Sequence, residues 1–112
     1  MVNFDIAFIN KLNSSVRRRP QMYIGGNNSC VDLHIFITGF IWGNEYITWD
    51  ELGLGQSFTK FVEVNLSFEY DKNIFWWWAN MIDRDYPDSG IEKFFKLWDQ
   101  YLLENGVNLS TK

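Results

Sequence analysis

The chain has 112 residues, of which 46% are hydrophobic and 21% are charged, and this composition is typical of one globular domain. No apolar run approaches the roughly 20 residues of a membrane span, and the single cysteine cannot form an internal disulfide, so a membrane protein and a secreted disulfide scaffold are excluded. The first twelve residues carry neither a basic flank nor a small-residue cleavage site, and we therefore expect a cytoplasmic protein.

The net charge of −4 is unevenly distributed along the chain. Residues 1–31 carry four basic side chains and one acidic side chain, a net charge of +3, whereas residues 32–112 carry six basic and thirteen acidic side chains, a net charge of −7. An acidic majority disfavours nucleic acid as a partner, because phosphate binding requires a basic surface. It favours basic protein partners, whose approach it steers.

The spacing of apolar residues predicts a first helix over residues 3–16, in which Phe4, Phe8 and Leu12 lie four positions apart. Pro20 ends this element, because the residue before a proline avoids the helical conformation.

A short extended segment is expected over residues 21–24, followed by a turn over residues 25–28, where two glycines and two asparagines adjoin. Within the extended segment we expect Met22 and Tyr23 to be core anchors between the first two helices.

A second helix is predicted to begin after Ser29, whose side chain resembles an N-cap with Asp32 three residues on, and to run to about Tyr46. Gly39 and Gly43 lie four residues apart within it. They would allow another helix to approach closely, either within the fold or across a dimer, and the sequence does not decide between the two.

Residues 48–57 are typical of a connecting loop, and residues 58–70 are ambiguous. The spacing of Phe58, Phe61 and Val62 suits a helix, whereas residues 62–70 also alternate as a strand does. We favour the helix, and a short extended segment or hairpin at 20–24 or 62–70 stays open.

Residues 74–82, with Trp76, Trp77 and Trp78, are apolar on all sides and are expected at the centre of the packing. A last helix is predicted over residues 91–103, with Gly106 as its C-cap. The fold expected is therefore mainly α, one globular domain over residues 1–112, built as a bundle of four to five helices.

The segment from Val16 to Gly26, VRRRPQMYIGG, resembles the stretch near the start of the ATPase domain of gyrase B and topoisomerase IV. Counting from Leu33, where that family has Leu-His, its catalytic Glu would fall at Gly39 and its magnesium-binding Asn at Gly43. Both functional groups are absent, as is the family's adenine-binding signature. An ATPase is not expected, and a degenerate nucleotide-binding domain is kept as an alternative.

A second resemblance covers almost the whole chain. After an amphipathic helix come Arg-Pro-x-Met-Tyr-Ile-Gly at residues 19–25, a helix with Leu33, Phe36, Gly39 and Phe40, paired tryptophans, and a terminal helix with Phe94, Phe95, Leu97 and Asp99. This order resembles a family of small, mostly helical bacterial proteins, some of which belong to toxin–immunity loci, including contact-dependent growth inhibition systems. Trp98, inserted before Asp99, departs from the motif.

Other chemistry-bearing residues give weaker signals. Cys30 and His34 could share a helix face, but two ligands do not make a zinc site and no third group orients a nucleophile. We therefore predict no catalytic, cofactor-binding or metal-binding residue and no enzyme. The run Arg17–Arg19 could contact phosphate or an acidic partner, although capping the first helix or pairing with the domain's own acids is favoured.

The family resemblance, together with the acidic balance, predicts an immunity protein that occludes the active site of a cognate toxin, most simply a basic nuclease domain. A regulatory or adaptor module that binds another protein is the alternative. The partner-binding residues are expected in two acidic groups, an acidic–aromatic loop first and a second loop after it. These residues are Glu45, Trp49, Asp50 and Glu51, then Asp83, Asp85 and Asp88.

Overall fold

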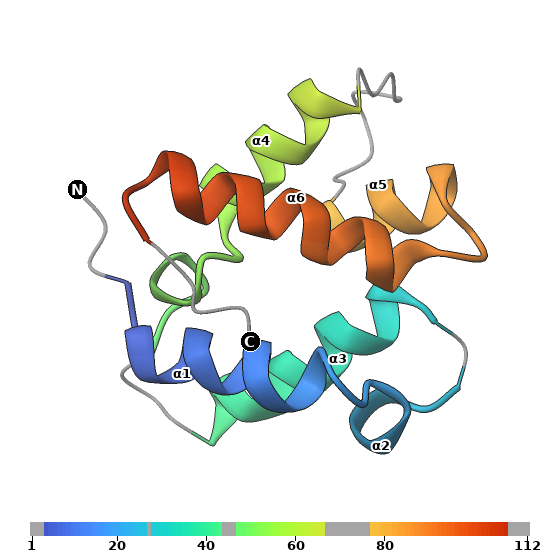
Figure 1. The fold of residues 1–112 in the computed structure, drawn as a ribbon, viewed down its shortest axis with the longest axis horizontal. Coiled ribbons are helices and arrows are strands. Elements are labelled where there is room, and N and C mark those ends of the chain that lie inside the picture. The colour runs from blue at the N-terminus through green and yellow to red at the C-terminus, as the bar shows by residue number, and fades with distance from the viewer. Residues whose placement is uncertain (1–3, 27, 44–46, 67–76, 108–112) are drawn as a thin grey trace.

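The fold was examined in a computed structural model that describes residues 4–26, 28–43, 47–66 and 77–107 (Figure 1). Every regular element in these ranges is helical, which confirms the mainly α prediction. None of these helices is long and apolar enough to cross a lipid bilayer. The elements, in chain order, are α1 (Ile6–Lys11), η1 (Leu12–Val16), α2 (Gln21–Ile24), α3 (Cys30–Trp42), η2 (Asp50–Leu52), α4 (Gln56–Asn65), α5 (Trp78–Asp85) and α6 (Gly90–Glu104).

The first predicted helix is confirmed over residues 6–16 as a continuous unit made of α1 and η1, while residue 3 of the predicted start lies outside the described residues. Asp5 is its N-cap, and the Asp5 carboxylate accepts the Phe8 backbone N–H at 3.0 Å. Its second half is a wider π-helical turn, in which the Arg17 N–H bonds the Leu12 carbonyl at 3.0 Å. The turn ends at Arg17, three residues before Pro20, in agreement with the expected stop.

The extended segment predicted at residues 21–24 is wrong, because these residues form the short helix α2. Pro20 has a φ of −58°, a value already suited to a first helical turn, and its carbonyl accepts the Tyr23 and Ile24 N–H groups. Met22 and Tyr23 are 67% and 42% exposed, so the prediction of core anchors is also wrong.

Helix α3 begins as predicted, with the Ser29 hydroxyl accepting the Asp32 N–H at 3.4 Å. It is described as far as Trp42, and the predicted end at Tyr46 lies outside the described residues. Gly39 is exposed, and a Cβ built on it meets no atom within 4 Å. Among the described residues no helix packs closely on Gly39, and close approach across a dimer stays a prediction.

The segment predicted as a loop over residues 48–57 contains the single turn η2, and α4 begins two residues earlier than expected. Helix, not strand, is confirmed for residues 58–65, because Phe58 and Val62 lie one helical turn apart and are both fully buried. Residues 67–70 of the strand alternative lie outside the described residues.

The core is centred on α5 and α6, which contact each other and both contact α3 and α4. Trp78 and Trp98 are fully buried on either side of Phe94, with ring centroids 4.9 and 5.7 Å from it. The apolar run predicted at the centre is confirmed for its buried residues Trp78, Ala79, Met81 and Ile82. Trp77 is half-buried and Asn80 is exposed, and residues 74–76 lie outside the described part. Figure 1 shows α6 crossing the middle of the molecule, with α4 on one side of it and α1 and α3 on the other.

Helix α6 ends in a Schellman motif, which confirms the predicted cap at Gly106. Gly106 has a φ of +81° and its N–H bonds the Leu103 carbonyl at 3.1 Å, while the Val107 N–H bonds the Leu102 carbonyl at 2.8 Å. The left-handed conformation is one that glycine adopts without strain.

Candidate protein-binding surfaces

The largest exposed apolar side chains gather on the outer side of α2 and α3, which we name the α2–α3 face. It consists of Met22 (67% exposed), Tyr23 (42%), Ile35 (63%), Phe36 (37%) and Trp42 (84%), with Gly39 among them. Tyr23 of α2 and Phe36 of α3 are in edge-to-face contact, with ring centroids 5.9 Å apart, so the two helices share this surface.

Two apolar stripes on α3 explain why this face is exposed. Leu33 and Ile37, four residues apart, are fully buried, while Ile35, Gly39 and Trp42 follow the opposite side of the helix. A helix that is apolar on both sides is typical of one covered on both sides. Within the part of the chain that the structure describes, the fold buries the first stripe and leaves the second exposed, which makes the second stripe a candidate binding surface.

The acidic–aromatic loop predicted as the first binding site is partly buried against the rest of the domain. Trp49 is half-buried and stacks on His34, with ring centroids 4.6 Å apart and an interplanar angle of 16°, and Trp77 lies 6.4 Å from Trp49. Burial lowers the pKa of His34 below its ordinary value, since the charged ring would lose its hydration. Trp49 is therefore a structural contact of α3 as well as a candidate binding residue.

The acids of this loop differ in their surroundings. Asp50 is exposed, whereas Glu51 is half-buried and accepts both the backbone N–H and the hydroxyl of Thr48 at 3.0 Å. Glu45 lies outside the described residues. Of the two acids of this loop that the structure describes, Asp50 is thus the more accessible to a partner.

Asp83, expected in the second acidic group, instead caps the start of α3, a role that was not predicted from the sequence. Its carboxylate accepts the Ser29 hydroxyl at 2.8 Å, the Cys30 N–H at 2.7 Å and the Val31 N–H at 2.9 Å. These donors form the start of α3, so a side chain of α5 satisfies the N-terminus of a helix that begins more than 50 residues earlier. A Cβ on Gly90 would stand 2.5 Å from Asp83 Oδ1. A glycine at this position therefore leaves room for the Asp83 carboxylate.

Asp85 and Asp88 of the second group are exposed at the turn between α5 and α6. The turn is held by Asn28, whose amide donates to the Asp88 carbonyl at 2.8 Å and to Glu92 Oε2 at 3.0 Å. In Figure 1 this turn, in orange, lies at the opposite side of the molecule from η2, in green. The structure therefore does not bring the two predicted acidic groups together.

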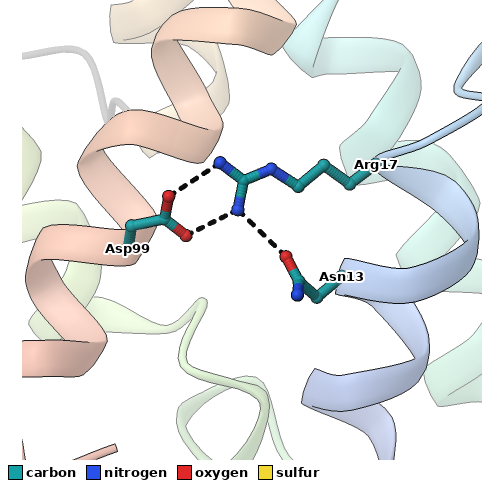
Figure 2. Close-up of polar contacts among 3 residues, drawn as sticks. All are labelled: Asn13, Arg17 and Asp99. Atoms are coloured by element: carbon teal, nitrogen blue, oxygen red, sulfur yellow. Dashed lines mark hydrogen bonds and ion pairs between the residues drawn. The ribbon is translucent and has the colours of Figure 1, made fainter. Parts of the chain in front are cut away.

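Of the three consecutive arginines, Arg17 pairs with an acid of the domain itself, as favoured from the sequence. Its guanidinium meets both carboxylate oxygens of Asp99 at 2.7 Å, and Nη1 also donates to Asn13 Oδ1 at 2.9 Å (Figure 2). The same group lies 4.9 Å above the ring centroid of Phe95. Arg18 and Arg19 are exposed beside α2.

The Cys30 thiol is fully buried and donates to the Gly90 carbonyl at 3.1 Å. Burial and the neighbouring Asp83 carboxylate raise the pKa of this thiol far above its ordinary value, so the reactive thiolate is suppressed. The ranges that the structure describes contain no group of three or more His, Cys, Asp or Glu side chains placed to hold a metal ion.

Comparison of the chain with protein-family models, with curated protein sequences and with solved structures found no match.

Proposed function

We propose that this protein is an immunity protein that binds a bacterial toxin domain one to one and blocks its active site. The proposal is carried by one observation: acidic side chains stay exposed on the folded surface, with Asp50 at η2 and Asp85 and Asp88 at the α5–α6 turn. Residues 19–25 and the terminal helix resemble a family of small helical bacterial proteins, some of which belong to toxin–immunity loci, and this resemblance suggests a toxin as the partner.

The electrostatics favour a basic partner at η2. The chain has no Lys or Arg between Arg19 and Lys60, so the sequence around Asp50 and Glu51 carries acidic charge only. The α5–α6 turn carries charges of both signs, since Lys93 and Lys96 line the same shallow hollow as Asp88 and Glu92. A toxin that binds phosphate is basic at its active site, and an acidic surface increases the rate at which it is captured.

The proposal is tested by co-expressing the protein with the product of the neighbouring open reading frame, then measuring growth rescue and complex formation. A one-to-one complex that weakens as salt is added is expected, because salt screens attraction between surface charges. Asp50→Lys should slow association by about tenfold, as charge changes at an interface rim act mainly on the association rate.

The matched control is Asp85→Lys, an identical charge reversal at the opposite side of the molecule. If this variant alone slows association, the toxin is bound at the α5–α6 turn instead. The absence of a complex and of growth rescue would reject the immunity function, and capture of a housekeeping protein alone would favour the adaptor alternative.

A further inference from the structure

The α2–α3 face has a composition unlike that of the acidic surfaces to which toxin binding is assigned above. Within Cys30–Gly43 the only acidic or basic side chain is Asp32, apart from His34 on the flank that meets Trp49. The exposed side chains at its centre are apolar, and Gly39 leaves a gap between Ile35 and Trp42.

We propose that this face binds a second copy of the same chain, forming a two-fold symmetric dimer in which the two α3 helices cross antiparallel at Gly39. This inference does not depend on the toxin-binding function, because it concerns a different surface and a different partner.

The positions of the large side chains fit such a crossing. Ile35 and Trp42 lie four residues before and three residues after Gly39, on the same side of the helix. Two-fold symmetry about Gly39 therefore brings Trp42 of each copy toward Ile35 of the other, so that both contacts form at once. Gly39 has no side chain to hold the helices apart, and Trp42 fills the space that remains.

Helix α2 extends the same contact. Tyr23 packs on Phe36, so α2 lies beside the N-terminal half of α3. An antiparallel crossing places that half against the C-terminal half of the other copy's α3. Met22 and Tyr23 thus lie at the flank of the crossing and widen the exposed apolar surface beside Phe36.

The area is sufficient for a specific, weak dimer. A large apolar or aromatic side chain presents roughly 200 Å², so the exposed fractions of the five side chains amount to roughly 600 Å² per copy. Two copies would bury roughly 1,200 Å², which lies at the lower end of specific interfaces. We therefore expect dissociation constants in the micromolar range or weaker, not an obligate dimer.

The charges also favour this face over others for self-association. Two copies, each with a net charge of −4, repel one another over most of their surfaces. The repulsion is smallest where a face carries few charged side chains, and Asp32 is the only Asp, Glu, Lys or Arg within Cys30–Gly43. Added salt should leave such a dimer unchanged or strengthen it, whereas it weakens an acid–base complex with a toxin.

The test is sedimentation velocity of the purified full chain over a wide concentration range, at low and high salt. We expect the mass to rise from one copy to two, and both Trp42→Ser and Gly39→Leu to weaken association at least about tenfold. Gly39→Leu probes the crossing itself, because the isolated domain has open space at this position and keeps its fold. Circular dichroism of each variant verifies that fold.

Val64→Ser and Leu103→Ser are matched controls, since they remove exposed apolar side chains from α4 and α6 that are 67% and 63% exposed. They should leave the dimer intact. A chain that stays monomeric throughout, a Gly39→Leu variant that dimerises normally, or controls as disruptive as Trp42→Ser would overturn the proposal. A monomer whose Trp42→Ser variant binds the toxin more weakly would instead assign this face to the toxin.

Discussion

Replacing Asp83 tests whether a side chain of α5 holds the start of α3. In the folded protein this carboxylate accepts three hydrogen bonds, from the Ser29 hydroxyl and from the backbone N–H groups of Cys30 and Val31, all at 2.7–2.9 Å. Asp83→Ala removes the three acceptor contacts and the negative charge together. The two N–H groups have no intrahelical partner, because they belong to the first turn of the helix.

The expected loss of unfolding free energy follows from these contacts. Losing the acceptor at a helix start costs about 0.5–2 kcal/mol, the favourable charge at the helix N-terminus adds about 0.3–1 kcal/mol, and the bond from Ser29 adds about 1 kcal/mol. The sum is about 3 kcal/mol, a large share of the roughly 6–17 kcal/mol typical of a domain this size. Asp83→Asn keeps one acceptor oxygen without the charge, and we expect it to lose about half as much.

Urea unfolding followed by circular dichroism measures both variants. A loss of about 3 kcal/mol lowers the midpoint by roughly 1–3 M, given the slope usual for small domains. Asp85→Ala, two residues away on the same helix and exposed, should stay within about 0.5 kcal/mol of the unchanged protein. The reasoning would be refuted if Asp83→Ala and Asp85→Ala had the same midpoint.

Three further predictions concern other contacts of the fold. In urea unfolding, Trp78→Phe should lower the free energy of unfolding by about 1 kcal/mol more than Trp98→Phe does. The Trp78 indole N–H donates to a backbone carbonyl at 2.8 Å, whereas the buried Trp98 Nε1 has no hydrogen-bond partner among the described residues. In the same assay, Arg17→Lys should lower the free energy of unfolding by about 1 kcal/mol, since lysine cannot form the bidentate contact that the guanidinium makes with Asp99. Equal urea midpoints of the two proteins would contradict this prediction. His34 has a lowered pKa in the folded state, so its contribution to stability is present above the ordinary value of 6.5 and is lost as the pH falls through the lower folded-state pKa. The melting temperature of the unchanged protein should therefore fall as the pH is lowered through this range, and it should fall less for His34→Gln. Identical pH profiles of the two proteins would show that the burial of His34 does not affect stability.

Local sequence signals predicted most of the helices. Ser29 and Gly106 occupy the capping positions expected of them, because caps depend on residues within one turn of the helix end. The error at residues 21–24 has a local cause too. Pro20 ends the preceding helix, but its φ of −58° also suits the first turn of a new one.

The surfaces were harder to predict, because they depend on which stripe of a helix the rest of the chain covers. Helix α3 is apolar on two opposite sides, and its sequence alone does not say that Leu33 is buried and Ile35 exposed. Asp83 looked like one of several acids in a turn, and its partners Ser29–Val31 lie more than 50 positions away. The acceptor of a distant helix start has no local signature, whereas Asp85 and Asp88 were correctly expected at the surface.

The contact between Arg17 and Asp99 also constrains how the protein is made. These residues are 82 positions apart, and the pair fixes the first helix against the last. Phe4, just before the first helix, also contacts Tyr101 of the last helix, with ring centroids 6.4 Å apart. During synthesis the first helix emerges long before the helix that makes these contacts. The domain therefore completes its folding only after α6 has left the ribosome, and a chain interrupted before α6 would lack both contacts.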